Sequence, residues 1–384
     1  MKSVFDRTEL RGLKLKNRLF RSATWEASAR ADGSLPEELI GRYEELAAGG
    51  VAAVITGFTG VSDEDRALAG MMRLSRDELI GDYARLAERI KKYDCRVLAQ
   101  IALEDFYGAG NRSRPRPLTI DELDEADIQA VVDLFVQAAR RAAEAGFDGV
   151  QLHVAHNFFL SRFISPGFNH RRDGYGRSPE GRARIALEIL RTIDRKAGSF
   201  HVGLKINCSD FFDGGLDFQE SLEICRLLAG QRLDSIEVSG NGTSRSAIKA
   251  LQNEAYFLDF ASQLQKTVET PVILVGGLRS LETMGRILND SPAGGQGRSF
   301  LAGISRLIPG TSGKRKAGAR SVEYFSLSRP LIREPQLPKR WLSDKRPADC
   351  ISCNRCYQTP DKSCVFIWRP PAGFSAGDQK SPMK

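Results

Sequence analysis

The sequence has no run of about 18 apolar residues, so it predicts no transmembrane helix. Its first twenty residues carry charges every few positions and lack the apolar core of a signal peptide, so we expect a cytoplasmic protein. The dinucleotide turn G-x-G-x-x-G does not follow the first candidate strand, and residues 310–314 do not have P-loop spacing. These absences argue against a membrane protein and against an open nucleotide-binding sheet.

Acidic residues are missing from residues 291–321, a segment with seven glycines and six basic residues. The basic residues are Arg298, Arg306, Lys314, Arg315, Lys316 and Arg320. When these six charges are taken from the net charge of +8, the other residues carry +2. The body of the protein is therefore nearly neutral, which favours a small-molecule substrate over nucleic acid. The segment itself predicts a disordered or loosely packed insertion.

Short β-branched runs alternate with longer amphipathic runs along the chain. Eight candidate strands cover residues 17–24, 51–58, 95–103, 147–153, 201–207, 233–239, 271–276 and 322–327. Strand–helix units repeated in this way favour a closed parallel barrel over an open doubly wound sheet. We therefore predict an α/β protein with a (β/α)8 TIM barrel in residues 1–342. Residues 343–384 form a cysteine-containing extension with a disordered tail.

Helical spacing of apolar residues predicts helices at residues 75–93, 126–145 and 179–197. Ser75 and Glu78 have the spacing of a capping box at the start of the first helix. Gly146 is expected to end the second helix, and Pro179 suits the first position of the third.

Two of the four histidines, His153 and His156, stand where the fourth candidate strand ends. Catalytic residues of such barrels lie at the carboxyl ends of the strands. Two imidazoles that converge there donate hydrogen bonds to a carbonyl or phenolate-like oxygen. A lone histidine is more often structural, but the pairing and the position favour a functional role.

The stretch from residue 153 to 184, HVAHNFFLSRFISPGFNHRRDGYGRSPEGRAR, resembles the old yellow enzyme family, also called NADH:flavin oxidoreductases. The resemblance extends over residues 3–290 and 322–341. It implies a (β/α)8 barrel that binds FMN, accepts hydride from NAD(P)H and commonly reduces an activated C=C bond. It also implies that His153 and His156 hydrogen-bond the substrate carbonyl.

The same resemblance implies which residues contact the flavin. Ser22, Ala23 and Thr24 end the first strand beside the flavin ring, with Thr24 near flavin O4. Gln100 bonds the pyrimidine edge. Lys205 lies near flavin N1 and O2, where its positive charge stabilises the reduced flavin.

A phosphate clamp is implied at the ends of the last two strands. Gly276 and Gly277 follow the seventh strand, and Ser328 and Arg329 follow the eighth. Backbone N–H groups and a guanidinium group suit a phosphate dianion.

Three features depart from the family pattern. Phe158 stands where the family has the tyrosine that protonates the substrate, and a phenyl ring has no proton to donate. Residues 104–107, Glu-Asp-Phe-Tyr, replace the usual H-x-G-R, which leaves Tyr107 or Tyr175 as alternative proton donors. The insertion 291–321 precedes the eighth strand, where it either bulges outward or disturbs the clamp.

Four of the seven cysteines form a C-x2-C-x2-C-x7-C pattern at Cys350, Cys353, Cys356 and Cys364. Such close spacing is typical of metal sites. Larger relatives of the dienoyl-CoA reductase and trimethylamine dehydrogenase types carry a [4Fe–4S] cluster after the barrel, with similar but longer spacing. A [4Fe–4S] cluster, zinc and free thiols therefore stay open. The remaining cysteines are expected to be buried small hydrophobes: Cys95, Cys208 and Cys225.

These observations predict an FMN-dependent oxidoreductase that takes hydride from NAD(P)H and reduces a small carbonyl-activated or other oxidised substrate. His153, His156 and Lys205 are its expected catalytic residues. One alternative is an Fe–S/FMN dehydrogenase or electron-transfer flavoprotein that uses the cysteines. Another is a non-catalytic barrel that has lost FMN because of the insertion. The sequence leaves the substrate, the choice between NADH and NADPH, and a homo-oligomeric state open.

Overall fold

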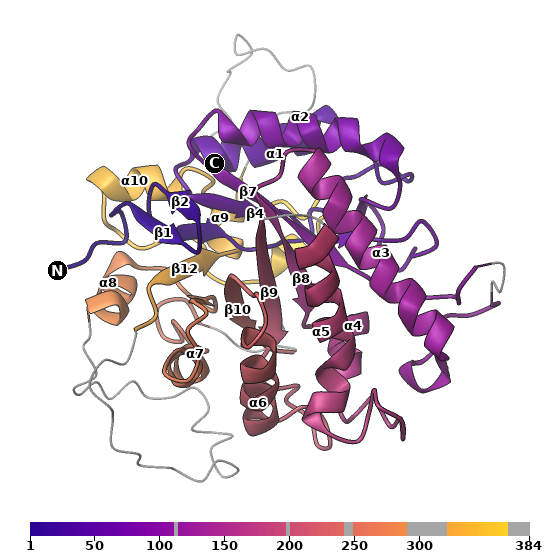
Figure 1. Cartoon of the computed structure of the whole chain (residues 1–384). Coiled ribbons are helices and arrows are strands. Elements are labelled where there is room, and N and C mark those ends of the chain that lie inside the picture. The colour runs from indigo at the N-terminus through magenta and orange to yellow at the C-terminus, as the bar shows by residue number, and fades with distance from the viewer. Residues whose placement is uncertain (111–113, 197–199, 242–248, 290–320, 368–384) are drawn as a thin grey trace.

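A computed structural model describes residues 1–110, 114–196, 200–241, 249–289 and 321–367. In this part of the chain, parallel strands form a closed ring (Figure 1). They are β3 (Leu19–Arg21), β4 (Ala53–Ile55), β7 (Arg96–Ala102), β8 (Gly149–Val154), β9 (His201–Asn207), β10 (Ser235–Ser239), β11 (Val272–Leu274) and β12 (Tyr324–Leu327). β12 pairs with β3, and β4 pairs with β7 to close the ring. The predicted (β/α)8 barrel is confirmed.

Each predicted strand range overlaps one of these strands, and seven contain it whole; the fourth range, 147–153, ends one residue before β8 does at Val154. The strands are buried on both faces, and every residue of β8, β9 and β11 is buried. Helices cover the outer face while side chains fill the interior, so parallel strands read as continuous apolar runs. This double burial explains runs such as PVILVG at residues 271–276.

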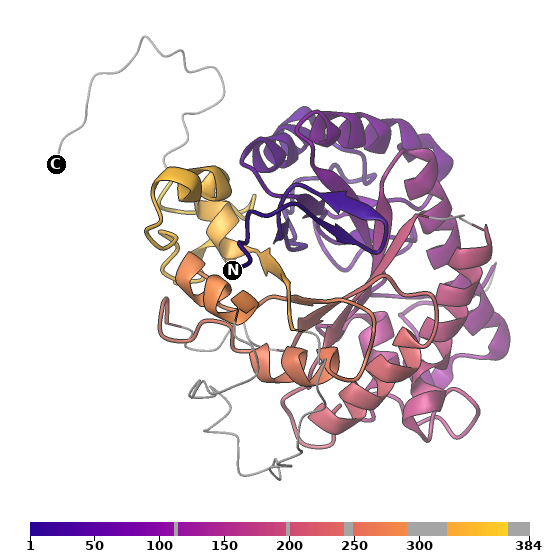
Figure 2. The same cartoon turned by 60° about the vertical axis from the view of Figure 1, so that its left-hand side comes forward.

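The helices lie outside the ring, as Figures 1 and 2 show from two directions. They are α1 (Glu37–Ala48), α2 (Ile80–Lys91), α3 (Glu125–Glu144), α4 (Phe159–Ile164), α5 (Pro179–Lys196), α6 (Phe218–Ala229), α7 (Leu258–Gln265), α8 (Leu281–Asn289), α9 (Arg329–Arg333) and α10 (Leu337–Ser343). Short 3-10 turns are η1 (Asp77–Leu79), η2 (Ile120–Glu122) and η5 (Arg355–Tyr357). Within the described residues, no helix combines the length and apolar character needed to cross a bilayer.

The helix boundaries confirm two predictions and correct a third. α5 begins at Pro179, and Gly146 (φ 77°) follows α3 in a left-handed conformation that glycine adopts readily. The capping box at Ser75 is wrong, because a 3-10 turn precedes α2 and has no side-chain cap. The Ser75 hydroxyl instead donates to Asp63 Oδ1 at 2.6 Å. The local pattern was outweighed by this contact with another loop.

The amino-terminal hairpin closes the bottom of the barrel, where the strands begin. β1 (Thr8–Leu10) and β2 (Leu13–Leu15) pair antiparallel. Their leucines pack against Phe20, Leu98 and Ile273 of the barrel strands. A short strand pair, β5 (Thr59–Gly60) and β6 (Met72–Arg73), extends β7 at the opposite end. The hairpin therefore leaves the carboxyl ends of the strands as the functional mouth.

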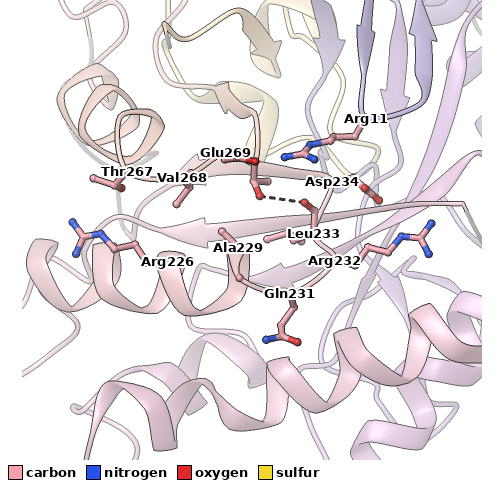
Figure 3. A pocket seen from close by; sticks show the side chains of 12 residues that line it. Arg11, Arg226, Ala229, Gln231, Arg232, Leu233, Asp234, Thr267, Val268 and Glu269 are labelled. Carbon is pink, nitrogen blue, oxygen red and sulfur yellow. Dashed lines mark hydrogen bonds between the residues drawn. The ribbon is translucent and has the colours of Figure 1, made fainter. Parts of the chain in front are cut away.

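A cavity of about 390 Å³ also opens at the bottom of the barrel (Figure 3). Its lining includes residues 229–234 and 267–270, which precede β10 and β11. Arg11, Arg226 and Arg232 extend their side chains around it (Figure 3). Because catalytic groups of TIM barrels lie at the other face, this cavity is not the candidate active site.

His201 begins β9 and is buried with its Nε2 atom 2.8 Å from Ser235 Oγ. Burial lowers the pKa of His201 to about 3. The unfolded chain therefore binds a proton at His201 below about pH 6.5 that the folded chain does not, so stability falls with falling pH. We expect this one residue to cost about 2 kcal/mol of stability at pH 5 relative to pH 7. In His201→Gln, the fall in the free energy of unfolding between pH 7 and pH 5 should be about 2 kcal/mol smaller than in the wild type, as measured by urea unfolding at each pH. Equal losses in the two proteins would contradict the assignment.

The described part of the carboxyl-terminal extension lies against the barrel. The Ala348 N–H donates to the Arg279 carbonyl at 2.8 Å, and Arg42 Nη2 lies 2.5 Å from Asp361 Oδ2. The predicted boundary after residue 342 stays a prediction. The predicted insertion, apart from residue 321, and the disordered tail lie outside the described residues. Of the other cysteines, all three are buried as expected: Cys95, Cys208 and Cys225.

Candidate active site at the mouth of the barrel

The predicted histidine pair lies together at the end of β8. His153 is buried within the strand, and His156 follows it in a left-handed conformation (φ 64°) with its side chain exposed. The two ring centres are 5.1 Å apart at nearly perpendicular orientation. His156 Nε2 lies 2.7 Å from Ser239 Oγ, whereas the buried Nδ1 of His153 has no hydrogen-bond partner among the described residues. An unpartnered buried polar atom at this place suits a ligand.

Both histidines are held in their neutral form. Burial lowers the pKa of His153 well below its usual value, and His156 and Lys205 lower it further. The pKa of His156 is also lowered, first by desolvation of its ring among neighbouring groups and then by the Lys205 charge. A neutral imidazole carries one N–H donor. His153 can therefore donate one hydrogen bond to a substrate oxygen, and His156 can donate one from Nδ1 when its Nε2 accepts from the Ser239 hydroxyl.

Lys205 is buried in β9, directly opposite Glu237 of β10 in the strand register. Its Nζ atom lies 3.1 Å from Glu237 Oε1 and 3.0 Å from Ser22 Oγ. Ser22 in turn donates to the same carboxylate oxygen at 2.5 Å. The predicted lysine therefore lies in the barrel interior, but as half of a buried ion pair.

Gln100 is buried in β7, where its Nε2 donates to Gln151 Oε1 at 2.8 Å. Gln151 Nε2 donates to Glu237 Oε2 at 2.9 Å. Gln151 and Glu237 are functional-site residues that the sequence did not predict. An acid within the apolar strand LDSIEVS was the available signal for Glu237, since a buried charge almost always has a partner.

The first and last strands meet beside this network. The Ser22 N–H donates to the Leu327 carbonyl at 2.9 Å, and Thr24 Oγ1 lies 2.9 Å from Ser328 Oγ. Ala23 and Thr24 are half-buried at the mouth. The structure thus brings together the predicted residues of the first strand and Ser328 of the clamp.

The predicted glycine pair follows β11 with φ values of 114° for Gly276 and 71° for Gly277. A Cβ atom at Gly277 would lie 2.4 Å from the Asn253 carbonyl, so larger residues are excluded there. Arg329 begins α9 and donates from Nη1 to Asn354 Oδ1. The glycines and the arginine lie at the ends of neighbouring strands, β11 and β12.

Phe158 lies against the histidine pair. Its ring centre is 4.8 Å from that of His153 and 4.9 Å from that of Phe58. Tyr175 donates its hydroxyl to Glu188 and is covered by the Arg184 guanidinium group, which is the environment of a packing aromatic. The mouth therefore has an aromatic ring where a proton donor would stand.

Glu104 follows β7 and forms an ion pair with Arg162 at 3.3 Å. Burial raises the pKa of Glu104 to about 7, and the Asp105 and Asp65 carboxylates add to the rise while Arg162 opposes it. The loop that replaces the family's H-x-G-R therefore carries a carboxyl group that titrates near neutral pH.

The four cysteines of the extension line one small cavity with Arg329. Burial raises the pKa of the Cys356 thiol. Across the described residues, no three histidine, cysteine or acidic side chains are arranged to hold a metal ion. The cysteines converge as predicted, but their arrangement here does not fit a metal centre.

The family described as NADH:flavin oxidoreductase / NADH oxidase matches residues 3–303. The chain belongs to this family. Its fold and its family are those of FMN-dependent NAD(P)H oxidoreductases of the old yellow enzyme type. The match covers most of the barrel, including both histidines and Lys205.

Individual relatives agree with this membership. The chain is 27% identical to a protein named NADH oxidase from Thermoanaerobacter brockii, over 92% of this chain and 53% of the relative. It is 25% identical to a 4,4'-dithiodibutanoate disulfide reductase from Rhodococcus erythropolis, over 93% of each chain. The chain thus spans about half the length of the first relative and nearly all of the second.

Solved structures share the fold. An old yellow enzyme homologue from Zymomonas mobilis superposes with a TM-score of 0.69 at 18% identity, over 91% of this chain and 95% of that one. Histamine dehydrogenase from Rhizobium sp. 4-9 superposes with a TM-score of 0.73 at 22% identity, over 94% of this chain and 51% of that one.

The residues at the mouth fit FMN. Lys205 uses two contacts among the described residues, so one N–H of its ammonium group is left for a ligand. Gln100 Oε1 accepts no hydrogen bond from the described residues. His153 Nδ1 is unpartnered, and two positive-φ glycines stand beside Arg329 on the neighbouring strand. Lys205 and Gln100 suit the polar edge of a flavin ring, and His153 suits a substrate oxygen. The glycines and Arg329 suit a phosphate.

Proposed function

We propose that this protein takes hydride from NAD(P)H through FMN bound at the mouth of the barrel and reduces a small carbonyl-activated or other oxidised substrate. The single observation that carries the proposal is the convergence of three groups at the mouth: the His153 and His156 ring centres are 5.1 Å apart, and His153 lies directly opposite Lys205 in the strand register. Bound FMN would supply the two-electron chemistry. The protein would supply the binding, the orientation and the charge.

Each predicted residue has a proposed role in this chemistry. Neutral His153 and His156 hold a substrate oxygen by donating one hydrogen bond each. Lys205 offers positive charge to the pyrimidine edge, and Gln100 bonds that edge. Ser22, Ala23 and Thr24 form the wall beside the ring.

The phosphate end has its own proposed residues. The backbone at Gly276 and Gly277 lets a phosphate approach closely, and Arg329 supplies the guanidinium group, with Ser328 beside it. A disulfide is one oxidised substrate to try, because the Rhodococcus relative of similar length is named for a disulfide reductase. The cytoplasmic location stays a prediction.

A visible absorption spectrum of protein purified without oxygen tests the proposal. We expect flavin bands, or their appearance after reconstitution with FMN, and bleaching on addition of NADH or NADPH. A protein that stays colourless after reconstitution contradicts the proposal and favours the non-catalytic barrel.

The second candidate is an Fe–S/FMN dehydrogenase or electron-transfer flavoprotein. The convergence of Cys350, Cys353, Cys356 and Cys364 on one cavity favours it. The described arrangement provides no metal site, so we derive no electron step through these residues. Iron and acid-labile sulfide in the same anaerobic preparation would support this candidate, and their absence would leave the thiols free.

A further inference from the structure

Glu237 lies at the centre of the buried polar network in the barrel. Its side chain is fully buried. Oε1 accepts from Lys205 and from Ser22, and Oε2 accepts from Gln151. These donors come from three other strands or strand ends, β3, β8 and β9. All three partners present a donor hydrogen, so the Glu237 carboxylate acts only as an acceptor in this network.

The charge of Glu237 offsets that of Lys205. Within the described part of the chain, Glu237 is the only acidic side chain that contacts the Lys205 ammonium group. The nearby histidines add no positive charge, because their pKa values are lowered. Lys205 therefore meets a ligand as part of a nearly neutral pair rather than as a lone cation.

Glu237 also determines which way two amide groups point. Because the Glu237 carboxylate accepts from Gln151, Gln151 turns its NH2 group toward Glu237 and its carbonyl toward Gln100. Gln100 must then donate from its own NH2 group to Gln151. This orientation leaves the Gln100 carbonyl oxygen for a ligand with an N–H group, such as the N3–H of a flavin.

We propose that Glu237 is a positioning residue that acts on the flavin through Lys205 and Gln100 and makes bound FMN harder to reduce. This inference rests on the proposed FMN site. Reduced flavin carries negative charge at its pyrimidine edge, so an uncompensated Lys205 would stabilise it more than the Lys205–Glu237 pair does. The residue thus tunes the enzyme toward a strongly reducing flavin.

The test is the midpoint potential of bound FMN in Glu237→Gln, which removes the charge but keeps a hydrogen-bonding side chain of the same shape. A neighbouring charge commonly shifts an ionisation equilibrium by at least about tenfold. We expect the two-electron reduction constant of bound FMN to rise by about tenfold or more, which corresponds to about 30 mV per tenfold. Sulfite, which adds to electron-poor flavins, should also bind more tightly.

Asp210→Asn is the matched control. Asp210 is another buried carboxylate beyond the end of β9, bonded to Asn207, Asn241 and the Leu216 N–H but not to Lys205. Its removal should change the reduction constant by less than about threefold. If Glu237→Gln does not fold, Glu237→Asp shortens the reach to Lys205 and should give a smaller rise.

An unchanged or lowered potential in a folded, FMN-loaded Glu237 variant overturns the inference, as does an equal rise in Asp210→Asn. Failure of the wild-type protein to bind FMN overturns the proposed function instead, so the two failures are distinguishable.

Discussion

Replacing His153 and His156 together with alanine is expected to weaken the binding of phenolate ligands to the FMN-loaded protein by about 10²- to 10⁴-fold. Each neutral ring can donate one hydrogen bond to the charged oxygen, and such bonds contribute about 1.5–3 kcal/mol each. The rings are close enough to share one oxygen, with centres 5.1 Å apart. Titration of the flavin absorption with a phenol gives the dissociation constant.

His201→Gln serves as the control, because His201 is a buried histidine at the first residue of β9, at the opposite end of the barrel. It should bind phenolates as the wild type does. Wild-type affinity in a double alanine variant that still binds FMN would exclude the proposed role of the pair.

Phe158→Tyr is expected to raise the rate at which the reduced protein transfers electrons to a cyclic enone by about 10²- to 10⁴-fold, the usual contribution of a general acid. The Phe158 ring already lies against His153, with centres 4.8 Å apart. A hydroxyl on this ring supplies the proton that the present side chain lacks. Anaerobic mixing of reduced protein with cyclohexenone, followed by the return of flavin absorption, measures the rate.

The matched control is Phe58→Tyr, which adds the same hydroxyl to the ring that contacts Phe158. It should give no comparable gain, and neither variant should change reduction by NADH more than about threefold. An enone rate in Phe158→Tyr that equals the wild-type rate, with NADH reduction intact, would show that proton donation is not what limits this substrate.

Local sequence pattern was enough to predict the barrel strands and two helix ends. Alternation of β-branched and amphipathic runs located every barrel strand, because double burial demands apolar residues throughout a parallel strand. Pro179 and Gly146 marked helix ends because their backbone preferences act whatever the surroundings. The capping box at Ser75 failed because a hydroxyl bonds whichever acceptor the fold brings near, here Asp63.

Some features of the candidate site could likewise be predicted from the sequence, and others could not. The histidine pair was visible because three positions at a strand end keep two side chains at one mouth. The partner of Lys205 was not visible, because Glu237 lies 32 positions away and Ser22 lies 183 positions away along the chain. Only the strand register places Glu237 opposite Lys205.

The sequence by itself determined the barrel and the family, since these follow from periodicity and from short motifs. The tertiary structure decided the charge state of that mouth. Closure of the barrel sets β3 against β12 and β10 against β9, so that Ser22, Lys205 and Glu237 share one buried network. A charged residue in an apolar strand indicates that it has a partner, but only the pairing across strands decides which residue is that partner.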